Sequence, residues 1–233
     1  MANYFDFSSD VMDTYMFLID SSSSMEDDAE NVQKGLKGYK RNLKDLPEAN
    51  SIAVSVSTFD TNLHLKEFTK VSNMDTSYHA DGATVLYYAI VKGAEYFNKY
   101  IEAIIAKKGC VPKATFIVFS DGEPCHDKAT MQEAAEAIKQ LNLQGITTVF
   151  VAFGNAISSN FGTKLGFKST KDVTDKDFIV KFLSEKLSKS CRDQSKSLKG
   201  LGANFFSQVG INSSNYSKTT EEVLEDDGWM EDF

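Results

Sequence analysis

The sequence predicts an α/β protein in which a largely parallel β-sheet lies between layers of helices. Three short apolar runs, at Thr14–Ile19, Ala114–Phe119 and Ile146–Phe153, have the composition and length of strands that are buried on both faces. Segments with the spacing of amphipathic helices separate these runs along the chain. This alternation is typical of right-handed βαβ crossovers, which build parallel sheets.

The first unit of the chain is predicted to be a strand, a loop and a helix. The strand Thr14–Ile19 leads into a polar cluster, Asp20–Ser24, which we expect to form the loop at its carboxyl end. Apolar residues then recur at helical spacing from Val32 to Leu46, and Pro47 is expected to stop that helix.

The middle of the chain predicts a β-hairpin and a long helix. Ile52–Phe59 is rich in β-branched and aromatic residues, and Leu63–Phe68 alternates between apolar and polar residues after the turn Asp60–Asn62. An apolar stripe along Val85–Lys107 then indicates an amphipathic helix.

The second half of the chain predicts two further helices around the third buried strand. Met131–Leu143 is helical in pattern and ends before Gly145, and Asp175–Lys189 follows the strand. The pattern weakens after Ser190, where Asp193–Leu201 could add one short helix. We therefore expect a lead at residues 1–13, one domain at 14–190 and a C-terminal extension at 191–233 that ends in a flexible acidic tail.

Charge and composition exclude several classes of partner. The net charge is −8, of which residues 218–233 contribute −6 through seven acidic side chains and one lysine. The rest of the chain is nearly neutral and carries no excess of Lys and Arg, so nucleic acid is not expected as a partner. The apolar runs are far shorter than the roughly 20 residues of a membrane-spanning helix, so no membrane contact is expected.

The cysteines and the first residues favour the cytoplasm. Cys110, Cys125 and Cys191 are odd in number and widely spaced, which argues against a disulfide framework and against a structural zinc site. The first residues lack the basic and apolar regions of a secretory signal. We therefore expect a cytoplasmic protein.

Oxygen-bearing side chains gather at the predicted carboxyl ends of two strands. Asp20, Ser22 and Ser24 follow the first strand at alternate positions, Asp121 follows the second, and Thr84 precedes the long helix. Ligands of open parallel sheets bind at this edge, where the loops converge. Carboxylate and hydroxyl oxygens suit Mg²⁺ or Mn²⁺, with Ca²⁺ a weaker candidate, so these five residues are the predicted metal ligands.

These residues give the chain a resemblance to the von Willebrand factor A domains and their metal-ion-dependent adhesion site. That site is written Asp-x-Ser-x-Ser, then Thr, then Asp, and all five positions are filled here, by Asp20, Ser22, Ser24, Thr84 and Asp121. The resemblance covers about residues 14–190. It implies a doubly wound, Rossmann-like sheet with one antiparallel edge strand, which the predicted hairpin fits, and a mobile last helix.

The resemblance also implies how the site works. In that family the serines and the threonine contact the ion, the aspartates hold it directly or through water, and an open position accepts a carboxylate from a partner protein. We therefore expect a binding module and no enzyme, with a partner that presents Asp or Glu. The chain looks like the stand-alone intracellular domains of bacterial and phage systems; Ser120 stands where Thr is commoner, and Asp81 where Gly is frequent.

Other interpretations of the same residues are open at this point. The chain could be a Mg²⁺-dependent phosphatase of the haloacid-dehalogenase type with Asp20 as its nucleophile, although Ser22 occupies the place of the usual acid. Asp20 and the serines could simply cap a helix. Cys125–Asp127 could hold a reactive thiol or a zinc ligand, and Lys199–Gly202 weakly resembles a phosphate loop. No pattern of a hydrolase triad is present.

The acidic tail offers a second kind of ligand. Its acids are accompanied by large apolar side chains, at Val223, Leu224, Trp229, Met230 and Phe233, for which a purely solvated segment has no use. One hypothesis is that a tail carboxylate reaches the metal of the same chain or of a neighbour. The other is that the tail is only a solvated acidic segment.

Overall fold

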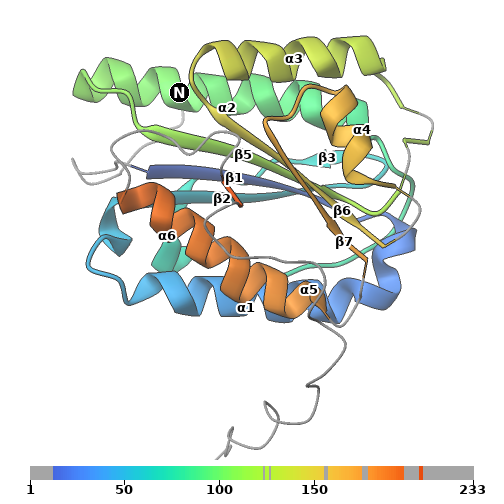
Figure 1. Ribbon diagram of the computed structural model, residues 1–233, viewed down its shortest axis with the longest axis horizontal. Helices are drawn as coiled ribbons and strands as arrows, with labels where there is room; N and C mark the ends of the chain where they lie inside the picture. The colour runs from blue at the N-terminus through green and yellow to red at the C-terminus, as the bar shows by residue number, and fades with distance from the viewer. Residues whose placement is uncertain are drawn as a thin grey trace, which may run out of the picture.

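A seven-stranded sheet forms the centre of the computed structural model (Figure 1). The structure describes residues 13–122, 124–125, 127–154, 157–174, 178–196 and 205–206. The order of strands across the sheet is β3-β2-β1-β5-β6-β7, and β4 also pairs with β2. The strands are β1 (Asp13–Asp20), β2 (Ile52–Phe59), β3 (Leu63–His64), β4 (Thr69–Lys70), β5 (Lys113–Ser120), β6 (Thr147–Phe153) and β7 (Ser169–Val173).

The sheet is parallel except at one edge. β1 lies between β2 and β5 and pairs in parallel with both, and β6 and β7 continue the parallel order. β3 and β4 run antiparallel to β2. Every residue of β1 and β6 is buried, as the continuous apolar runs predict for strands covered on both faces. The predicted fold class, a doubly wound and mostly parallel sheet with an antiparallel edge, is confirmed.

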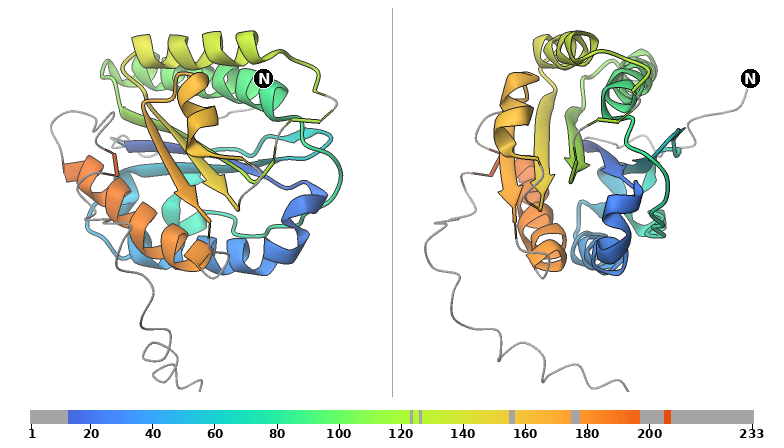
Figure 2. Two further views of the ribbon diagram at one scale, coloured as in Figure 1. Left: turned by 45° about the vertical axis from the view of Figure 1, so that its right-hand side comes forward. Right: turned by 90° about the vertical axis from the view of Figure 1, so that its right-hand side faces the viewer.

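Helices cover both faces of the sheet (Figures 1 and 2). α2 and α3 lie on one face, and α1, α5 and α6 lie on the other. Each layer encloses its own buried apolar cluster against the sheet. The helices are α1 (Ala29–Lys44), α2 (Leu86–Lys108), α3 (Met131–Leu143), α4 (Ser159–Lys164), α5 (Phe178–Lys181) and α6 (Ser188–Lys196), with short 3₁₀ turns η1 (Ser23–Asp28), η2 (Ala49–Ser51) and η3 (Val71–Asn73) and a π-helical segment η4 (Phe182–Leu187).

Local chemistry explains where the predicted helices start and stop. α1 ends at Lys44, before Pro47, and α2 ends at Lys108, where Gly109 follows as the cap with a left-handed φ of 68°. α3 begins with a capping box in which Thr130 and Glu133 satisfy each other's backbone groups. These boundaries agree with the predicted ones within two residues, except at the start of α1.

The hairpin differs from its prediction in the length of its second strand. Only Leu63 and His64 pair with β2, and pairing resumes at β4 after an interruption. In between, the backbone of Lys66 bonds to side chains of β2, because its N–H donates to Ser57 Oγ (3.0 Å) and its carbonyl accepts from Ser55 Oγ (2.8 Å). The buried hydroxyls take the place of a regular ladder.

The last helix is longer and less regular than predicted. Helical structure runs without a break from Phe178 to Lys196 through α5, η4 and α6, so the separate helix predicted from Asp193 does not form as such within these residues. Burial of Leu187 and Cys191 on one side keeps the chain against the core past residue 190. Residues 175–177 and 197–201 of the two predicted helices lie outside the described residues.

The elements that the sequence did not predict include α4 and β7. The strand β7 reads Ser-Thr-Lys-Asp-Val and lies at the edge of the sheet, so it lacks the apolar run of the central strands. α4 is a single short helix beside it, with Gly162 close to the Phe150 side chain. Elements of this kind have no periodicity to detect.

The helices and the two ends of the chain bear on the predictions about membranes and about the terminal segments. Among the described helices, none is long and apolar enough to cross a membrane. Residues 1–12 of the predicted lead at 1–13 and the predicted acidic tail lie outside the described residues, whereas Asp13 is the first residue of β1. Phe205 and Phe206, which are described, are buried against the core on the side of η4.

Candidate metal centre

The carboxyl ends of β1 and β5 meet at the point where the order of the sheet changes direction. From β1 the chain moves to β2 on one side, and it later returns to β5 on the other side of β1. Loops that leave two such strands diverge and open a crevice between them, which is the usual ligand site of doubly wound sheets. Asp20 ends β1, Ser120 ends β5, and Asp121 follows it.

Four of the five predicted ligands lie in this crevice as two hydrogen-bonded pairs whose hydroxyl oxygens are in contact. Ser22 Oγ donates to Asp20 Oδ1 over 2.6 Å, and the hydroxyls of Ser22 and Ser24 lie 3.0 Å apart. Ser24 Oγ in turn donates to Asp121 Oδ1 over 2.8 Å. Ser22 is extended, but the chain turns into η1 at Ser23, so Asp20, Ser22 and Ser24 converge through a turn as well as through alternation.

Asp20 is the most enclosed member of the group. Its carboxylate is fully buried, and Oδ1 accepts a second bond from the Ser22 N–H (3.0 Å) while Oδ2 accepts one from Ser120 Oγ (2.6 Å). Burial raises the pKa of Asp20 to about 6; the bonds from Ser120 and Ser22 oppose this rise and the negative charge of Asp121 adds to it. The site therefore stabilises the ionised form of Asp20 poorly unless positive charge is nearby.

Thr84 reaches the site through backbone contacts. The loop that precedes α2 lies against the loop after β1, because the Asp81 N–H donates to the Ser21 carbonyl (2.7 Å) and the Ser23 N–H donates to the Gly82 carbonyl (3.0 Å). Thr84 itself is buried, and its carbonyl accepts a bond of 2.8 Å from the Cys125 N–H. The Thr84 segment thus contacts the loops of both β1 and β5.

A glycine makes this approach possible. Gly82 has a left-handed φ of 83°, and a Cβ atom there would lie 2.6 Å from the Thr61 hydroxyl. That hydroxyl accepts a bond of 3.0 Å from the Ala83 N–H, which fixes the loop one residue before Thr84. Asp81 also stabilises this loop, because its carboxylate accepts a hydrogen bond of 2.7 Å from the Gly82 N–H.

The oxygen arrangement fits a small divalent cation. In octahedral Mg²⁺ sites the ligand distance is about 2.0 to 2.1 Å, so neighbouring ligands are about 3 Å apart. Successive oxygens of the chain from Asp20 to Asp121 are separated by 2.6, 3.0 and 2.8 Å. Two carboxylates also match the charge of one divalent cation. Within the described residues no three His, Cys, Asp or Glu side chains gather to hold a metal, so the hydroxyls are essential to this donor set.

Two residues at the site were not among the predicted ligands. Ser120 supports Asp20 through its hydroxyl, and its place at the end of β5 could have indicated that role. Tyr78 donates from its hydroxyl to the Asp20 carbonyl over 2.5 Å. Tyr78 comes from an irregular segment, so no sequence pattern pointed to it.

The geometry weakens the simpler interpretations. Ser22 occupies the N-cap of η1 but makes no capping bond with its side chain, so capping does not explain the cluster. Asp127 accepts from the N–H groups of Tyr87 and Tyr88 (2.6 and 2.9 Å) and thereby caps α2 from a distant loop. Cys125 is exposed, and His126 lies outside the described residues, as does the weak phosphate-loop pattern at 199–202.

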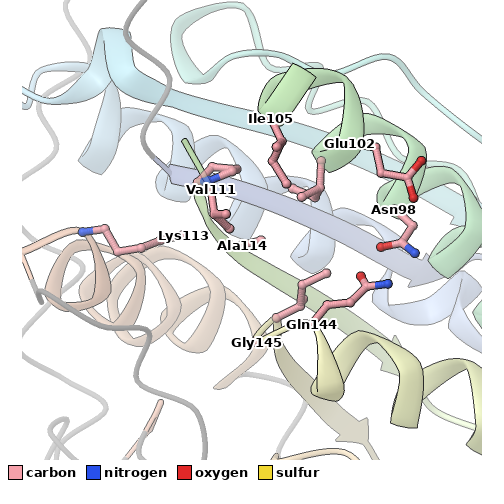
Figure 3. Close-up of a pocket in the computed structure, with 11 residues that line it drawn as sticks. Asn98, Glu102, Ile105, Val111, Lys113, Ala114, Gln144 and Gly145 are labelled. Atoms are coloured by element: carbon pink, nitrogen blue, oxygen red, sulfur yellow. The ribbon is translucent and has the colours of Figure 1, made fainter. Parts of the chain in front are cut away.

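A cavity elsewhere in the molecule is separate from this site. It has a volume of about 560 Å³ and lies at the amino ends of the strands, between the end of α2 and the starts of β5 and β6 (Figure 3). Its lining includes Ile105, Val111 and Gln144. None of the five predicted ligands lines it.

Comparisons with solved structures show the same fold. The pilus adhesin SpaC from Lactobacillus rhamnosus GG is 14% identical with a TM-score of 0.60, over 77% of this chain and 29% of that one. Proximal thread matrix protein 1 from the mussel byssus is 14% identical with a TM-score of 0.55, over 79% of this chain and 47% of that one. That structure has a zinc-occupied MIDAS motif, the abbreviation for metal-ion-dependent adhesion site. Manganese-loaded TRAP protein of Plasmodium vivax is 15% identical with a TM-score of 0.51, over 76% of this chain and 74% of that one.

The likeness to these proteins is therefore one of fold, and the chain matches less than half of the adhesin and of the mussel protein. No curated protein sequence matches. The family model of the von Willebrand factor type A domain matches residues 16–185, which is most of the chain and lies inside the predicted domain at 14–190. The chain therefore belongs to the von Willebrand factor type A domain family.

Proposed function

We propose that this protein is a metal-dependent binding module that captures a carboxylate of a protein partner. Asp20, Ser22, Ser24, Thr84 and Asp121 would hold one Mg²⁺ or Mn²⁺ ion. The observation that carries the proposal is the continuous chain of side-chain oxygens from Asp20 through both serines to Asp121, which links the ends of β1 and β5. The zinc-occupied MIDAS motif of the mussel protein and the manganese-loaded state of the TRAP protein, which share this fold, support a divalent cation as the ligand.

The charge balance of the donor set determines the kind of partner. Asp20 and Asp121 offset the charge of a divalent cation, whereas hydroxyls add none. The bound ion supplies an electrophilic position that favours one more anionic oxygen. Asp121 is only half-buried and Ser24 is exposed, so a carboxylate of a partner can approach from that side. We propose an Asp or Glu side chain as that ligand.

Binding without catalysis is favoured over the phosphatase interpretation by the environment of Asp20. A nucleophilic carboxylate needs access to phosphorus, but Asp20 is fully buried and both of its oxygens accept hydrogen bonds. Ser22 donates to Asp20 at the position where the phosphatase needs a general acid. We propose that the protein has no phosphatase activity with or without Mg²⁺.

We propose the cytoplasm as the setting of this activity. Support comes from the cysteines, since Cys110, Cys125 and Cys191 are all free thiols.

A pull-down in two buffers tests the proposal. Wild type and Asp20→Ala would be used as baits in Mg²⁺ and in EDTA, with Asp45→Ala as the matched control, because Asp45 is an exposed carboxylate at the far end of α1. We expect partners that are retained by wild type and Asp45→Ala in Mg²⁺ and lost in EDTA and with Asp20→Ala. Partners retained equally by Asp20→Ala in EDTA would contradict metal-dependent capture.

A further inference from the structure

A basic groove runs along one face of α2, beside the antiparallel edge of the sheet. It has a volume of about 380 Å³ and lies between α2 and the chain from Asn62 to Leu65. Tyr88, Lys92, Tyr96 and Lys99 line it, and their spacing of three or four residues places them on one face of the helix. Apolar, aromatic and cationic side chains thus share one groove.

Two lysines give the groove its unbalanced positive charge. Lys92 is neutralised by Glu95, which accepts bonds of 2.9 Å at both carboxylate oxygens. Lys99 and Lys128 are exposed, and neither forms a salt bridge within the part of the chain that the structure describes. Lys128 lies 5.4 Å from the centre of the Tyr88 ring, so aromatic surface and positive charge occur together there.

The groove begins beside the candidate metal centre. Lys128 donates to the Thr61 carbonyl (3.5 Å), and Thr61 binds the Ala83 N–H next to Thr84. A peptide that occupies the groove therefore lies close to the loops of the metal site. Leu65 at the other wall is 39% exposed, which leaves apolar surface for a large side chain.

We propose that the acidic segment 218–233 of the same chain docks in this groove. Its charge is −6, opposite to the net +2 of three lysines and one glutamate in the lining. It also carries Trp229, Met230 and Phe233, which complement the tyrosines and leucines of the groove. Docking uses no metal ion, so the proposal stands apart from metal-dependent capture.

The length of the chain allows intramolecular docking. Phe206 is the last described residue, and the 23 residues from there to Trp229 extend up to about 80 Å. A domain of this size is about 40 Å across, so the path around its surface from the η4 side to α2 is about 60 Å. A tether of this length gives a local concentration of about millimolar, so weak ion pairs and one aromatic anchor suffice for docking. The docked segment would compete with acidic partners for access to the neighbouring metal centre.

Trp229 is the only tryptophan of the chain, so its fluorescence reports on the tail in the intact protein. We would measure Trp229 emission and its quenching by acrylamide in the full chain, in EDTA, for wild type, Lys99→Glu/Lys128→Glu and a control, Lys37→Glu/Lys164→Glu. The control makes the same charge change at exposed lysines of α1 and α4. We expect blue-shifted, protected emission in wild type and control, and loss of both in the groove variant.

Two further measurements test whether charge attraction between the tail and the groove causes the protection of Trp229. At about 1 M salt, where the Debye length is about 3 Å, protection should fall in wild type. Asp226→Lys/Asp227→Lys should restore protection to the groove variant, which also shows that the variant is folded. Equal quenching of Trp229 in wild type and groove variant would overturn the proposal, as would an equal loss in the control. Protection that grows with protein concentration would place the tail on a second copy and would overturn intramolecular docking.

Discussion

Ser24 Oγ donates a hydrogen bond of 2.8 Å to Asp121 Oδ1, and this bond joins two loops that are 97 residues apart in the sequence. Both residues follow strands that are neighbours in the sheet. Because Ser24 also lies 3.0 Å from the Ser22 hydroxyl, the bond completes an oxygen chain that ends at the buried Asp20. The candidate metal centre thus depends on the order of strands across the sheet as much as on the residues themselves.

The pH dependence of stability should reveal the buried Asp20. Its pKa is about 6 in the folded protein and 3.8 ordinarily, so between these values the folded chain holds a proton that the unfolded chain has lost. The contribution of Asp20 to the stability of the metal-free protein should therefore fall as pH rises from about 4 to about 6, by up to about 3 kcal/mol. Asp20→Asn should remove this fall. Denaturant titrations of wild type and Asp20→Asn in EDTA across this pH range measure the difference. Identical pH profiles of stability for the two proteins would contradict the prediction.

Replacement of Ser120 should destabilise the metal-free protein through Asp20. Ser120→Ala removes the donor to Asp20 Oδ2 and leaves a buried carboxylate oxygen without that bond, at a cost of about 1 to 3 kcal/mol. Ser120→Thr keeps the hydroxyl and should cost much less. Urea unfolding of the two variants at pH 7 measures the difference. If both variants matched wild type, the bond would contribute nothing to stability.

Thr84 should matter more for partner capture than for folding. Its backbone carbonyl holds the loop through Cys125, and that bond survives side-chain substitution. Thr84→Ala should therefore unfold close to wild type yet bind an acidic partner more weakly at saturating Mg²⁺. Thr84→Ser retains the hydroxyl and should bind nearly as well. Equal affinity of wild type and Thr84→Ala would argue against a ligand role for this residue.

The contact between α1 and the last helix requires glycine. A Cβ atom at Gly38 would lie 2.4 Å from Ser184 Cβ, within the π-helical segment η4. Helix propensity alone predicts that Gly38→Ala stabilises α1 by about 0.5 to 1 kcal/mol, whereas the overlap predicts a cost of about 1 to 3 kcal/mol. We expect the overlap to dominate. Thermal unfolding of Gly38→Ala shows whether the substitution raises or lowers stability. Lys37→Ala, at an exposed neighbouring position, is measured in parallel as the control.

The sequence contained most of the information that places the candidate site. The apolar runs of β1 and β5 locate their own carboxyl ends, and the proximity of Asp20 and Asp121 follows once these two parallel strands are neighbours in the sheet. The strand β7 was missed because an edge strand needs no apolar run. The segment η4, which packs closely against Gly35 and Gly38, was missed because residue spacing does not distinguish a π-helical turn from an α-helical one. Tyr78 bonds to the Asp20 carbonyl across 58 residues, a relationship that local pattern cannot indicate.

The central claim, that these residues bind a divalent cation, is tested most directly by calorimetric titration of Mg²⁺ and Mn²⁺ into wild type, Asp121→Ala and the control Asp45→Ala. We predict one ion per chain for wild type and control, with a gain in stability of about 2.7 kcal/mol at a hundredfold excess over Kd. Asp121→Ala should lose both the binding heat and the gain in stability. Unchanged metal affinity in Asp121→Ala, or no binding by wild type, would contradict the account.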